Sequence, residues 1–544
     1  MAAKTIDVKL LEQMFLAGAM NLEAHKEWIN ELNVFPVPDG DTGTNMCLTV
    51  TAAVRELEDL DGAGMSELCK AMSSGSLRGA RGNSGVILSQ LLRGFTRIVR
   101  DHERLDVPVL AEGMKKATET AYKAVMKPKE GTILTVARGV SEKAEELAAA
   151  GASMEDFLTG VVREGSRVLA KTPDMLPVLK DAGVVDAGGQ GLITMLEGAL
   201  LAYLGKIVAP ESSAWMAELM AEKEAEDEIR FPYSMQMTVT PEHAAGEQET
   251  DALQKALSRM GENALVSRTE GKLLVMVDTD KPGEVLTKVL GTGALSGISI
   301  LNRALGEEAS QNSQPSLMQP PQAEWKEVGF ISVSVGNGFA ETFSALGVDY
   351  QILGGQTMNP STEDVLHAIS QVPAKNIFVF PNNKNIIMAA NQARDLTEDK
   401  NIIVIPTKTI PQGITAVISY DPEMSVEDNT EMMTDNIHHV MTGQVTYAVR
   451  DTKIDDFEIR KGDIMALGDN GLLAVGSDIS EITKNAIRQM ADESTALISI
   501  YYGEDFPAES AEAMGHEIGI EFPGCDVEVS CGGQPIYYCI VSVE

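Results

Sequence analysis

Two acidic side chains lie two residues apart in a turn that is rich in proline and glycine. They are Asp39 and Asp41, in the run P-V-P-D-G-D-T-G-T-N-M that begins at Pro36. No lysine or arginine lies between Asn33 and Val50. Two carboxylates without a basic partner favour a bound cation, and Mg²⁺ prefers carboxylate, water and phosphate oxygens. The alternative is an ordinary turn at a helix start, because Asp and Thr are good N-caps and Pro and Gly set turn dihedrals.

A second segment, G-A-R-G-N-S-G-V-I-L-S-Q at residues 79–90, places small residues ahead of an apolar stretch. Backbone N–H groups at such a helix start point outward, and the helix dipole favours a phosphate there. Arg78 and Arg81 would add positive charge beside it. The competing interpretation is a tight loop between two closely packed helices.

Two further segments repeat this design, E-G-T-I-L at residues 130–134 and G-V-V-D-A-G-G-Q-G-L at residues 183–192. Each places glycine together with Thr or Asp ahead of a predicted helix. Four such loops in one region favour a converging ligand site over four unrelated turns. The sequence contains no G-x-x-x-x-G-K-[ST] motif, and residues 291–297 and 82–86 miss the dinucleotide-binding and G-x-S-x-G patterns.

Helices are predicted to position these loops. Between residues 11 and 32, apolar residues recur at spacings of three, four and seven, which marks one apolar helix face. Runs of β-branched residues with period two are nearly absent before residue 205. We therefore predict an all-helical domain over residues 1–205, with further helices at 44–60, 65–74, 86–99, 111–125, 135–150, 153–170 and 191–204.

The pattern changes after an acidic connector at residues 206–230. Apolar runs at 235–239 and 273–277 predict strands, and the stretch at 249–260 between them predicts a helix. These elements predict a small α/β domain over residues 228–308. The polar, proline-rich stretch at 310–322 is typical of a linker.

From residue 326 onward, strand and helix patterns alternate, which predicts a mainly parallel sheet. The predicted strands are 328–335, 350–353, 376–380 and 401–405, and the predicted helices are 338–346, 361–370 and 385–396. A helix at 425–441 and further strands, the last at 536–543, complete a third domain over residues 326–544. The predicted fold class is thus multidomain, with an all-α first domain and two α/β domains.

Two polar loops follow predicted strands of the third domain, at residues 354–361 and 381–385. The carboxyl ends of strands are where open α/β sheets bind ligands. We predict that these loops dock a partner or form a vestigial ligand cleft. Helix N-capping by Ser361 and Asn385 is the alternative.

The composition of the chain limits the classes of partner that it can bind and indicates its cellular compartment. The length of 544 residues predicts three or four domains at roughly 150 residues each. A net charge of -36 argues against nucleic acid or an anionic membrane surface as a direct partner. No apolar run approaches the ~20 residues that span a bilayer, and the first residues lack a signal-peptide core. We therefore expect a cytoplasmic protein without integral membrane association.

The five cysteines form no disulfide framework, because they are few and odd in number. Cys525, Cys531 and Cys539 cluster near the end of the sequence, but their spacing is not C-x-x-C. We predict that these three are thiols in the core of strands rather than metal ligands.

Taken together, the four loop motifs resemble those of the ATP-binding subunit of bacterial dihydroxyacetone kinases. They resemble the ATP-binding subunit of bacterial fatty acid kinase more closely. The order of the three domains, with a last segment that contains G-G-Q-P-I-Y, is also similar to that kinase subunit. The resemblance implies a dihydroxyacetone kinase L-subunit-like first domain, formed as a helical barrel with ATP at its mouth, and a DegV-like C-terminal region.

The resemblance also implies roles for individual residues. Asp39 and Asp41 would hold Mg²⁺, and Asn33 lies near the position where related kinases place a third Asp. The residues expected around the nucleotide come from all four motifs: Thr42, Asn45, Met46, Asn83, Ser84, Gly85, Thr132 and Asp186. Independently of the resemblance, Arg78 or Arg81 could stabilise the charge that is transferred, with Arg81 as the predicted catalytic residue, or the two could form salt bridges within their loop; both interpretations stay open.

The expected reaction is the phosphorylation of a fatty acid. Dihydroxyacetone kinases carry His at the position of Thr42, so the sequence favours the fatty acid kinase branch. In that branch a separate, DegV-like lipid-binding protein presents the fatty acid carboxylate, and phosphoryl transfer gives an acyl phosphate for phospholipid synthesis. The family also suggests a homodimer. The alternatives are a dihydroxyacetone-type kinase and a non-enzymatic, nucleotide-sensing regulator on a kinase fold.

One departure from the family concerns zinc. Middle domains of this family can carry a zinc site of one Cys and two His, and these positions align with Ser234, Met276 and Asp278. A hydroxyl, a thioether and a lone carboxylate form a poor set of zinc ligands. We therefore predict no zinc in this protein.

Overall fold

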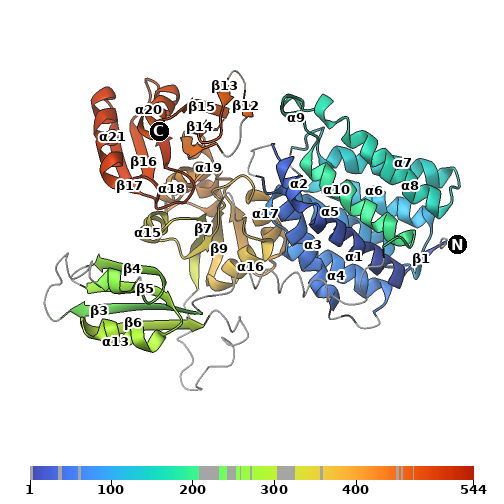
Figure 1. Cartoon of the computed structure of the whole chain (residues 1–544), viewed down its shortest axis with the longest axis horizontal. Coiled ribbons are helices and arrows are strands. Elements are labelled where there is room, and N and C mark those ends of the chain that lie inside the picture. The colour runs from blue at the N-terminus through green and yellow to red at the C-terminus, as the bar shows by residue number, and fades with distance from the viewer. Residues whose placement is uncertain are drawn as a thin grey trace. The chain divides into compact units, whose positions relative to one another are not determined.

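The structure is a computed structural model of the whole chain (Figure 1). It describes residues 4–34, 40–58, 60, 63–125, 127–207, 232–241, 253–257, 259–269, 272–302, 325–355, 359–448, 452–454, 457–469 and 471–544. The chain forms two compact units, one from Met1–Glu211 with Ala323–Glu544 and one from Ser212–Gln322. In the part of the chain that the structure describes, no helix combines the length and apolarity needed to cross a bilayer.

The N-terminal region of the first unit is helical. Its elements are β1 (Ile6–Asp7), α1 (Val8–Ala24), α2 (Lys26–Glu31), α3 (Thr42–Glu58), α4 (Met65–Arg78), α5 (Gly82–Val99), β2 (Arg104–Leu105), α6 (Val107–Ala124), α7 (Ile133–Ala149), α8 (Met154–Leu169), the 3₁₀ turn η1 (Thr172–Asp174), α9 (Pro177–Ala182) and α10 (Ala187–Tyr203). This confirms the helices that the periodicity predicts. The predicted helix at 86–99 begins four residues earlier, because the small residues of its glycine-rich segment form its first turn.

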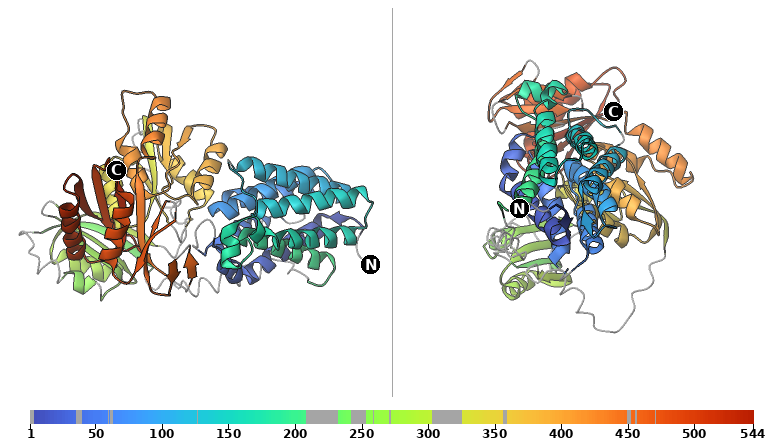
Figure 2. Two further views of the ribbon diagram at one scale, coloured as in Figure 1. Left: turned by 90° about the horizontal axis from the view of Figure 1, so that it is seen from above. Right: turned by 90° about the vertical axis from the view of Figure 1, so that its right-hand side faces the viewer.

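The helices of this region pack against each other along most of their length. The pairs α1 with α10 and α5 with α6 lie side by side (Figure 2). Polar side chains start several of them: Asp106 and Ser153 each accept a hydrogen bond from a backbone N–H of the first helical turn. Large apolar side chains such as Phe157 and Leu88 are fully buried. An apolar cavity of about 170 Å³ lies among them.

The second unit is a four-stranded sheet with a helix. Its described elements are β3 (Tyr233–Pro241), β4 (Glu262–Thr269), β5 (Lys272–Thr279), α13 (Pro282–Leu290) and β6 (Gly293–Asn302), in the strand order β4-β5-β3-β6. All three strand pairs are antiparallel. Val285 and Val289 of α13 pack with alternate apolar residues of β3 and β5 in one core. Of the helix predicted at 249–260, residues 253–257 are helical and residues 249–252 and 258 lie outside the described residues.

The three positions that replace the family's zinc ligands come together in this sheet. Ser234 pairs with Asp278 in the β3–β5 register. Met276 pairs with Gln236, two residues further along each strand. The backbone therefore brings the three positions together, and the prediction that they bind no zinc rests on their chemistry alone.

The C-terminal region of the first unit begins with the predicted parallel sheet. Its elements are β7 (Lys326–Ser334), α15 (Asn337–Ala345), β8 (Tyr350–Leu353), α16 (Thr362–Gln371), β9 (Ala374–Phe380), α17 (Ile387–Leu396) and β10 (Asn401–Val404). The strand order is β10-β9-β7-β8, and every pair is parallel, which confirms the prediction. Apolar residues of α16 and α17 cover one face of this sheet.

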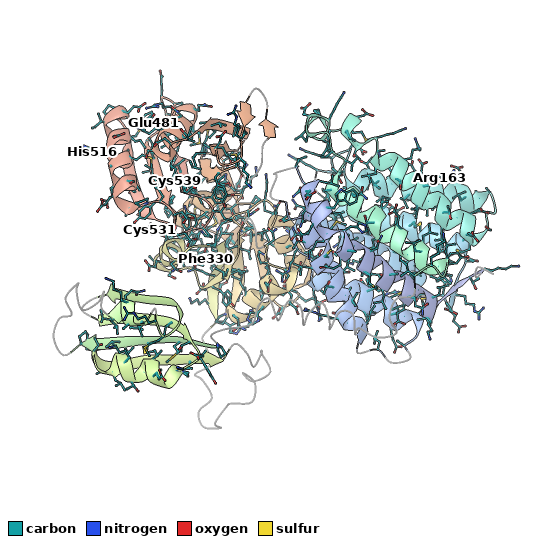
Figure 3. All side chains as sticks on the ribbon, viewed as in Figure 1. Arg163, Phe330, Glu481, His516, Cys531 and Cys539 are labelled. Atoms are coloured by element: carbon teal, nitrogen blue, oxygen red, sulfur yellow. The ribbon has the colours of Figure 1, made fainter. Side chains whose placement is uncertain are left out.

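A second, six-stranded sheet follows, in the order β15-β14-β11-β18-β16-β17. The elements are α18 (Ile410–Ile418), α19 (Val426–Asn436), β11 (Met441–Tyr447), the hairpin β12 (Thr452–Ile454) and β13 (Phe457–Ile459), β14 (Ile464–Gly468), β15 (Gly471–Gly476), α20 (Ile479–Met490), β16 (Leu497–Tyr502), α21 (Ala508–Glu521), β17 (Asp526–Cys531) and β18 (Cys539–Val543). Helices α20 and α21, which carry Glu481 and His516 in Figure 3, pack on one face of this sheet. A core of aromatic and aliphatic residues from α15, α18 and α19 joins the two sheets.

One prediction in this region is wrong, and a second is confirmed for only one of its three residues. The helix predicted at 425–441 ends at Asn436, because Met441 begins β11, an inner strand of the second sheet. Of the three clustered cysteines, only Cys539 lies buried within a strand, and Cys531 is exposed at the end of β17 (Figure 3). Cys525 precedes that strand. None of the five cysteines, all of which the structure describes, forms a disulfide bond.

The helical region and the parallel sheet touch each other within the first unit. Helix α17 contacts α5, and α16 contacts α4. A small apolar cluster of Ala80, Val86 and Ala389 lies at this contact. Polar contacts accompany this cluster: Asn83 at the start of α5 bonds Asn385, and Gln392 of α17 bonds Gln90 of α5 and the backbone oxygen of Leu77 in α4.

Candidate functional site

The start of α3 carries the second carboxylate of the Pro/Gly turn. Gly40, directly before Asp41, has a φ of 65°, in the left-handed region that favours glycine. The backbone oxygen of Asp41 accepts the N–H of Asn45 at 2.8 Å, which makes Asp41 the residue at which α3 begins. The N–H of Thr44 donates to Asn30 Oδ1 at 3.1 Å. Asp41 thus lies at the positive end of a helix dipole, where an anion or a cation–phosphate complex is favoured.

The start of α5 lies directly against the start of α3. Gly82 has a φ of 57°, and a Cβ there would lie 2.6 Å from Asn45 Nδ2. A Cβ at Gly85 would lie 2.3 Å from Thr49 Oγ1. The N–H of Arg81 donates to the same hydroxyl at 3.3 Å. Only glycine permits this approach, so the glycines of the second motif bring its backbone N–H groups next to the first motif.

The starts of α7 and α10 form the other half of the site. Asp186 begins α10 and accepts the N–H of Gly189 at 2.7 Å. A Cβ at Gly188 would lie 3.3 Å from the Cβ of Ile133, the first residue of α7. Thr132 precedes that residue, and its hydroxyl donates to the backbone oxygen of Lys129 at 2.8 Å. The third and fourth motifs are therefore neighbours.

One methionine joins the two halves. A Cβ at Gly191 in α10 would lie 2.6 Å from the sulfur of Met46 in α3. These close glycine contacts connect α5 with α3, α3 with α10, and α10 with α7. The structure thus links the starts of all four helices that follow the sequence motifs.

The remaining predicted residues fall in three classes. Thr42, Asn45 and Met46 are buried, and Asn83 and Ser84 are partly exposed at the start of α5. Asn33 is buried just after α2, where its N–H donates to the oxygen of Asn30 at 3.1 Å. Asp39 lies outside the described residues, so only Asp41 of the carboxylate pair has a described position.

Burial changes the acidity of Asp186. Desolvation raises the pKa of this carboxyl from 3.8 to about 6, although the N–H groups of Gly189 and Ile133 act in the opposite direction by hydrogen bonding. Asp186 is 8% exposed, because the starts of α7 and α10 cover its carboxyl, and this burial is the cause of the raised pKa.

The two arginines of the second motif have different surroundings. Arg78 is exposed, and its guanidinium lies 3.9 Å from Glu56. The guanidinium of Arg81 instead donates to the backbone oxygen of Asn359 at 3.0 Å and lies 3.6 Å from Asp364. Arg81 thus makes salt-bridge contacts, the second of its two interpretations, but it makes them with the C-terminal region rather than within its own loop.

The two polar loops of the C-terminal region provide the other side of these contacts. Asn359 Nδ2 donates to Asp41 Oδ2 at 2.6 Å, and Asn83 Nδ2 donates to Asn385 Oδ1 at 3.1 Å. Ser361 does cap α16, as the alternative interpretation predicts. Asn385 does not cap α17, because the residue at the cap position of that helix is Ile386.

Sequence reasoning missed that these loops meet the helix starts of the same chain. Asn359, Asp364 and Gln392 were not predicted as site residues. The polar character of residues 354–361 was a usable signal, but no local pattern identifies a contact between loops that lie so far apart in the chain.

The carboxylate of Asp41 supplies oxygen ligands, which suit a hard cation. Among the residues that the structure describes, no three His, Cys, Asp or Glu side chains gather as a ready-made metal cluster. The fit to Mg²⁺ therefore depends on Asp41 together with Asp39, and Mg²⁺ usually binds proteins through one or two carboxylates plus substrate phosphates.

Comparisons with known proteins cover nearly the whole chain. Family models match the DAK2 domain at residues 36–201, the middle domain of FakA-like fatty acid kinase subunits at 230–309 and the C-terminal domain of the same subunits at 329–544. Protein YloV of Bacillus subtilis (strain 168) is 38% identical over 555 residues, which cover 100% of each chain.

Solved structures match parts of the chain. The dihydroxyacetone kinase of C. freundii in complex with AMP-PNP and Mg²⁺ covers 36% of this chain and 34% of its own, at 17% identity and a TM-score of 0.28. The Streptococcus pneumoniae fatty acid kinase B3 protein loaded with linoleic acid covers 34% of this chain and 76% of its own, at 14% identity and a TM-score of 0.28. Given the full-length relative and the three matched domains, the chain belongs to the FakA-like family of fatty acid kinase subunits.

Proposed function

We propose that this protein is the ATP-binding subunit of a fatty acid kinase. It transfers the terminal phosphoryl group of ATP to the carboxylate of a fatty acid that a separate, DegV-like lipid-binding protein presents. The product is an acyl phosphate for phospholipid synthesis. Membership of the FakA-like family supports the fatty acid as acceptor, and the DAK2 domain supports a kinase.

The observation that carries this proposal is the linkage of four helix starts beside Asp41. Each start offers N–H groups without intrahelical partners and the positive end of a dipole. A protein with a net charge of -36 repels a nucleotide triphosphate unless such groups and a metal ion offset the repulsion. Phosphoryl transfer relies on this kind of positioning and electrostatic stabilisation more than on covalent participation by the protein.

The site residues divide by role in this proposal. Asp39, Asp41 and Asn33 hold Mg²⁺, which when bound neutralises charge on the phosphates. The residues that surround the nucleotide are Thr42, Asn45, Met46, Asn83, Ser84, Gly85, Thr132 and Asp186. Arg81 acts beside the start of α5, close to where the transferred group would lie.

A carboxylate acceptor also explains what the motifs lack. A fatty acid is already ionised at neutral pH, since the reference pKa of a carboxyl is about 4. The acceptor therefore needs no general base, and none of the four motifs contains His. An alcohol acceptor would need its proton removed during transfer.

Several wider features belong to the same proposal. The helices of the N-terminal region form a barrel with ATP at its mouth. The chain divides into a kinase domain at 1–205, a middle domain at 228–308 and a partner-binding domain at 326–544. It acts in the cytoplasm as a homodimer, without bound zinc or nucleic acid.

An acceptor comparison tests the proposed function. Purified full-length protein is incubated with ATP and Mg²⁺, and with either a fatty acid loaded on a DegV-like protein, the fatty acid alone, or dihydroxyacetone. Hydroxylamine traps acyl phosphates as hydroxamates. We expect hydroxamate only in the first reaction. Phosphorylated dihydroxyacetone would favour the triose kinase alternative, and no product in any reaction would favour a regulator.

A further inference from the structure

Asn359 reaches from the C-terminal region to the proposed metal site. It lies in the loop between β8 and α16, and its side chain is 3% exposed. Its Nδ2 donates to Asp41 Oδ2 at 2.6 Å, a short hydrogen bond. The two residues are 318 positions apart in the sequence.

The orientation of this amide follows from its partner. An ionised carboxylate only accepts hydrogen bonds, so the amide nitrogen of Asn359 must face Asp41. The amide oxygen is bonded to the same carbon as that nitrogen, so it belongs to the same buried end of the side chain. Asn359 Oδ1 is buried and has no hydrogen-bond partner among the residues that the structure describes. An unpaired buried carbonyl is destabilising, and a cation or its bound water would offset that cost.

A polar network holds the loop of Asn359 in place. Arg81 donates to the backbone oxygen of Asn359, and the N–H of Thr362 donates to the oxygen of Ala80 at 3.1 Å. Behind them, Gln392 Nε2 donates to the oxygen of Leu77 at 2.6 Å, and its Oε1 accepts from Gln90 Nε2 at 2.8 Å. Both glutamines are buried. Fully satisfied buried networks of this kind fix one arrangement of the groups that form them.

We propose that Asn359 is a positioning residue of the metal–nucleotide site, supplied by the C-terminal region of the same chain. Its Nδ2 orients the carboxylate of Asp41, and its Oδ1 offers an oxygen to the hydrated Mg²⁺ ion. This inference rests on the proposed function, because it takes Asp41 as a magnesium ligand. Hydrogen bonds to a ligating carboxylate are a recurrent means of fixing its orientation, and their loss typically costs roughly 10–100-fold in metal affinity.

A consequence of this arrangement is that docking of the C-terminal region and binding of the metal–nucleotide complex favour each other. Any change that loosens the polar network should weaken nucleotide binding when Mg²⁺ is present. The same change should leave metal-free binding as it was, because only the metal depends on Asn359.

The test measures binding of a non-hydrolysable ATP analogue to the full-length protein by calorimetry, across a Mg²⁺ titration and in EDTA. Asn359→Ala removes the amide. Asn376→Ala is the matched control, because Asn376 donates to the backbone oxygen of Glu327 at the far end of β9. Gln392→Ala loosens the network without touching Asp41. Hydrogen exchange at the Thr362 amide reports docking, and thermal unfolding confirms that each variant is folded.

We expect Asn359→Ala to raise the Mg²⁺ concentration needed for half-maximal binding by about 10-fold or more, with no change in EDTA. Gln392→Ala should act in the same direction and speed exchange at Thr362, and Asn376→Ala should match the unaltered protein. Equal binding by Asn359→Ala and Asn376→Ala would overturn the inference, as would tighter binding or an equal loss in EDTA. If the unaltered protein binds no Mg²⁺–nucleotide at all, the proposed function itself fails.

Discussion

Asp41 is the residue on which the site depends most directly. It directly precedes α3, and its backbone oxygen accepts the first helical hydrogen bond. Its side chain accepts a hydrogen bond from the amide of Asn359. A helix-start acid that only capped its helix would have no need for an amide from a distant loop. This contact shows that Asp41 has a partner beyond its own helix, and metal binding by Asp41 stays a prediction.

Asp41→Asn should leave the fold intact, because Asn is as good an N-cap as Asp. It removes the negative charge that binds a cation, so Mg²⁺-dependent nucleotide binding should fall by at least about 10-fold and turnover should be abolished. Calorimetry and a turnover assay measure the two effects. Retained turnover would remove Asp41 from the metal site.

Asp186 should give the helical region a pH-dependent stability. Its pKa is raised from 3.8 to about 6 by burial, so the folded state binds a proton more tightly than the unfolded state. The stability that this proton contributes is fully present below about pH 4 and is lost as the pH rises through about 6. Asp186→Asn removes the titration while keeping an acceptor for the N–H of Gly189.

The comparison uses the full-length protein and its Asp186→Asn variant in urea, from about pH 4 to about pH 7, a range that spans both pKa values. Hydrogen exchange across α10 reports the stability of that helix. We expect the unaltered protein to lose stability relative to the variant as the pH rises. Parallel pH profiles for the two proteins would show that Asp186 does not titrate in this range.

At the scale of elements, the site depends on helices that pack closely against each other at glycine residues. The starts of these helices were predictable, because small residues followed by an apolar period mark a helix start in the sequence alone. Which start packs on which was not predictable, because the contacts of Gly82 with Asn45 and of Gly191 with Met46 join positions far apart in the chain. The position of β11 was missed for a similar reason, since only its pairing with β14 and β18 distinguishes it from the end of the preceding helix.

Gly82→Ala should weaken the nucleotide site more than Gly151→Ala does. Gly82 and Gly151 have φ angles of 57° and 69°, so an alanine is strained at both positions. A Cβ at Gly82 would also displace Asn45, 2.6 Å away, whereas none of the described atoms lies within 4 Å at Gly151. Both variants should lose about 1 kcal/mol of stability.

Only Gly82→Ala should weaken nucleotide binding, by several-fold in a calorimetric titration. Similar binding by the Gly82→Ala and Gly151→Ala proteins would indicate that the contact between α3 and α5 does not shape the nucleotide site.

At the scale of the whole molecule, the kinase helices and the parallel sheet share a polar contact. The sheet itself was predictable from alternating strand and helix patterns, and the polar loops at its strand ends were identified as functional candidates. Their partner was not, because an Asn or a Gln that pairs across an interface has no sequence signature of its own. Arg81 sits at this contact, where its charge lies between the start of α5 and Asp364.

Arg81→Ala should lower turnover by about 10-fold or more, because a positive charge beside the transferred group stabilises it and because the loop of Asn359 loses its anchor. Arg78→Ala is the matched control, since Arg78 precedes Arg81 closely in the sequence and pairs with Glu56 on the exposed side. Turnover within about two-fold of normal for Arg81→Ala would exclude a catalytic role.

The proposed function requires that one phosphoryl group moves from ATP to a fatty acid carboxylate held by a partner protein. ADP and acyl phosphate can be measured together in one reaction of the full-length protein with ATP, Mg²⁺ and a fatty-acid-loaded DegV-like protein. We predict equal amounts of the two products, both dependent on the partner. ADP that forms without acyl phosphate, or at the same rate without the partner, would contradict the proposed function.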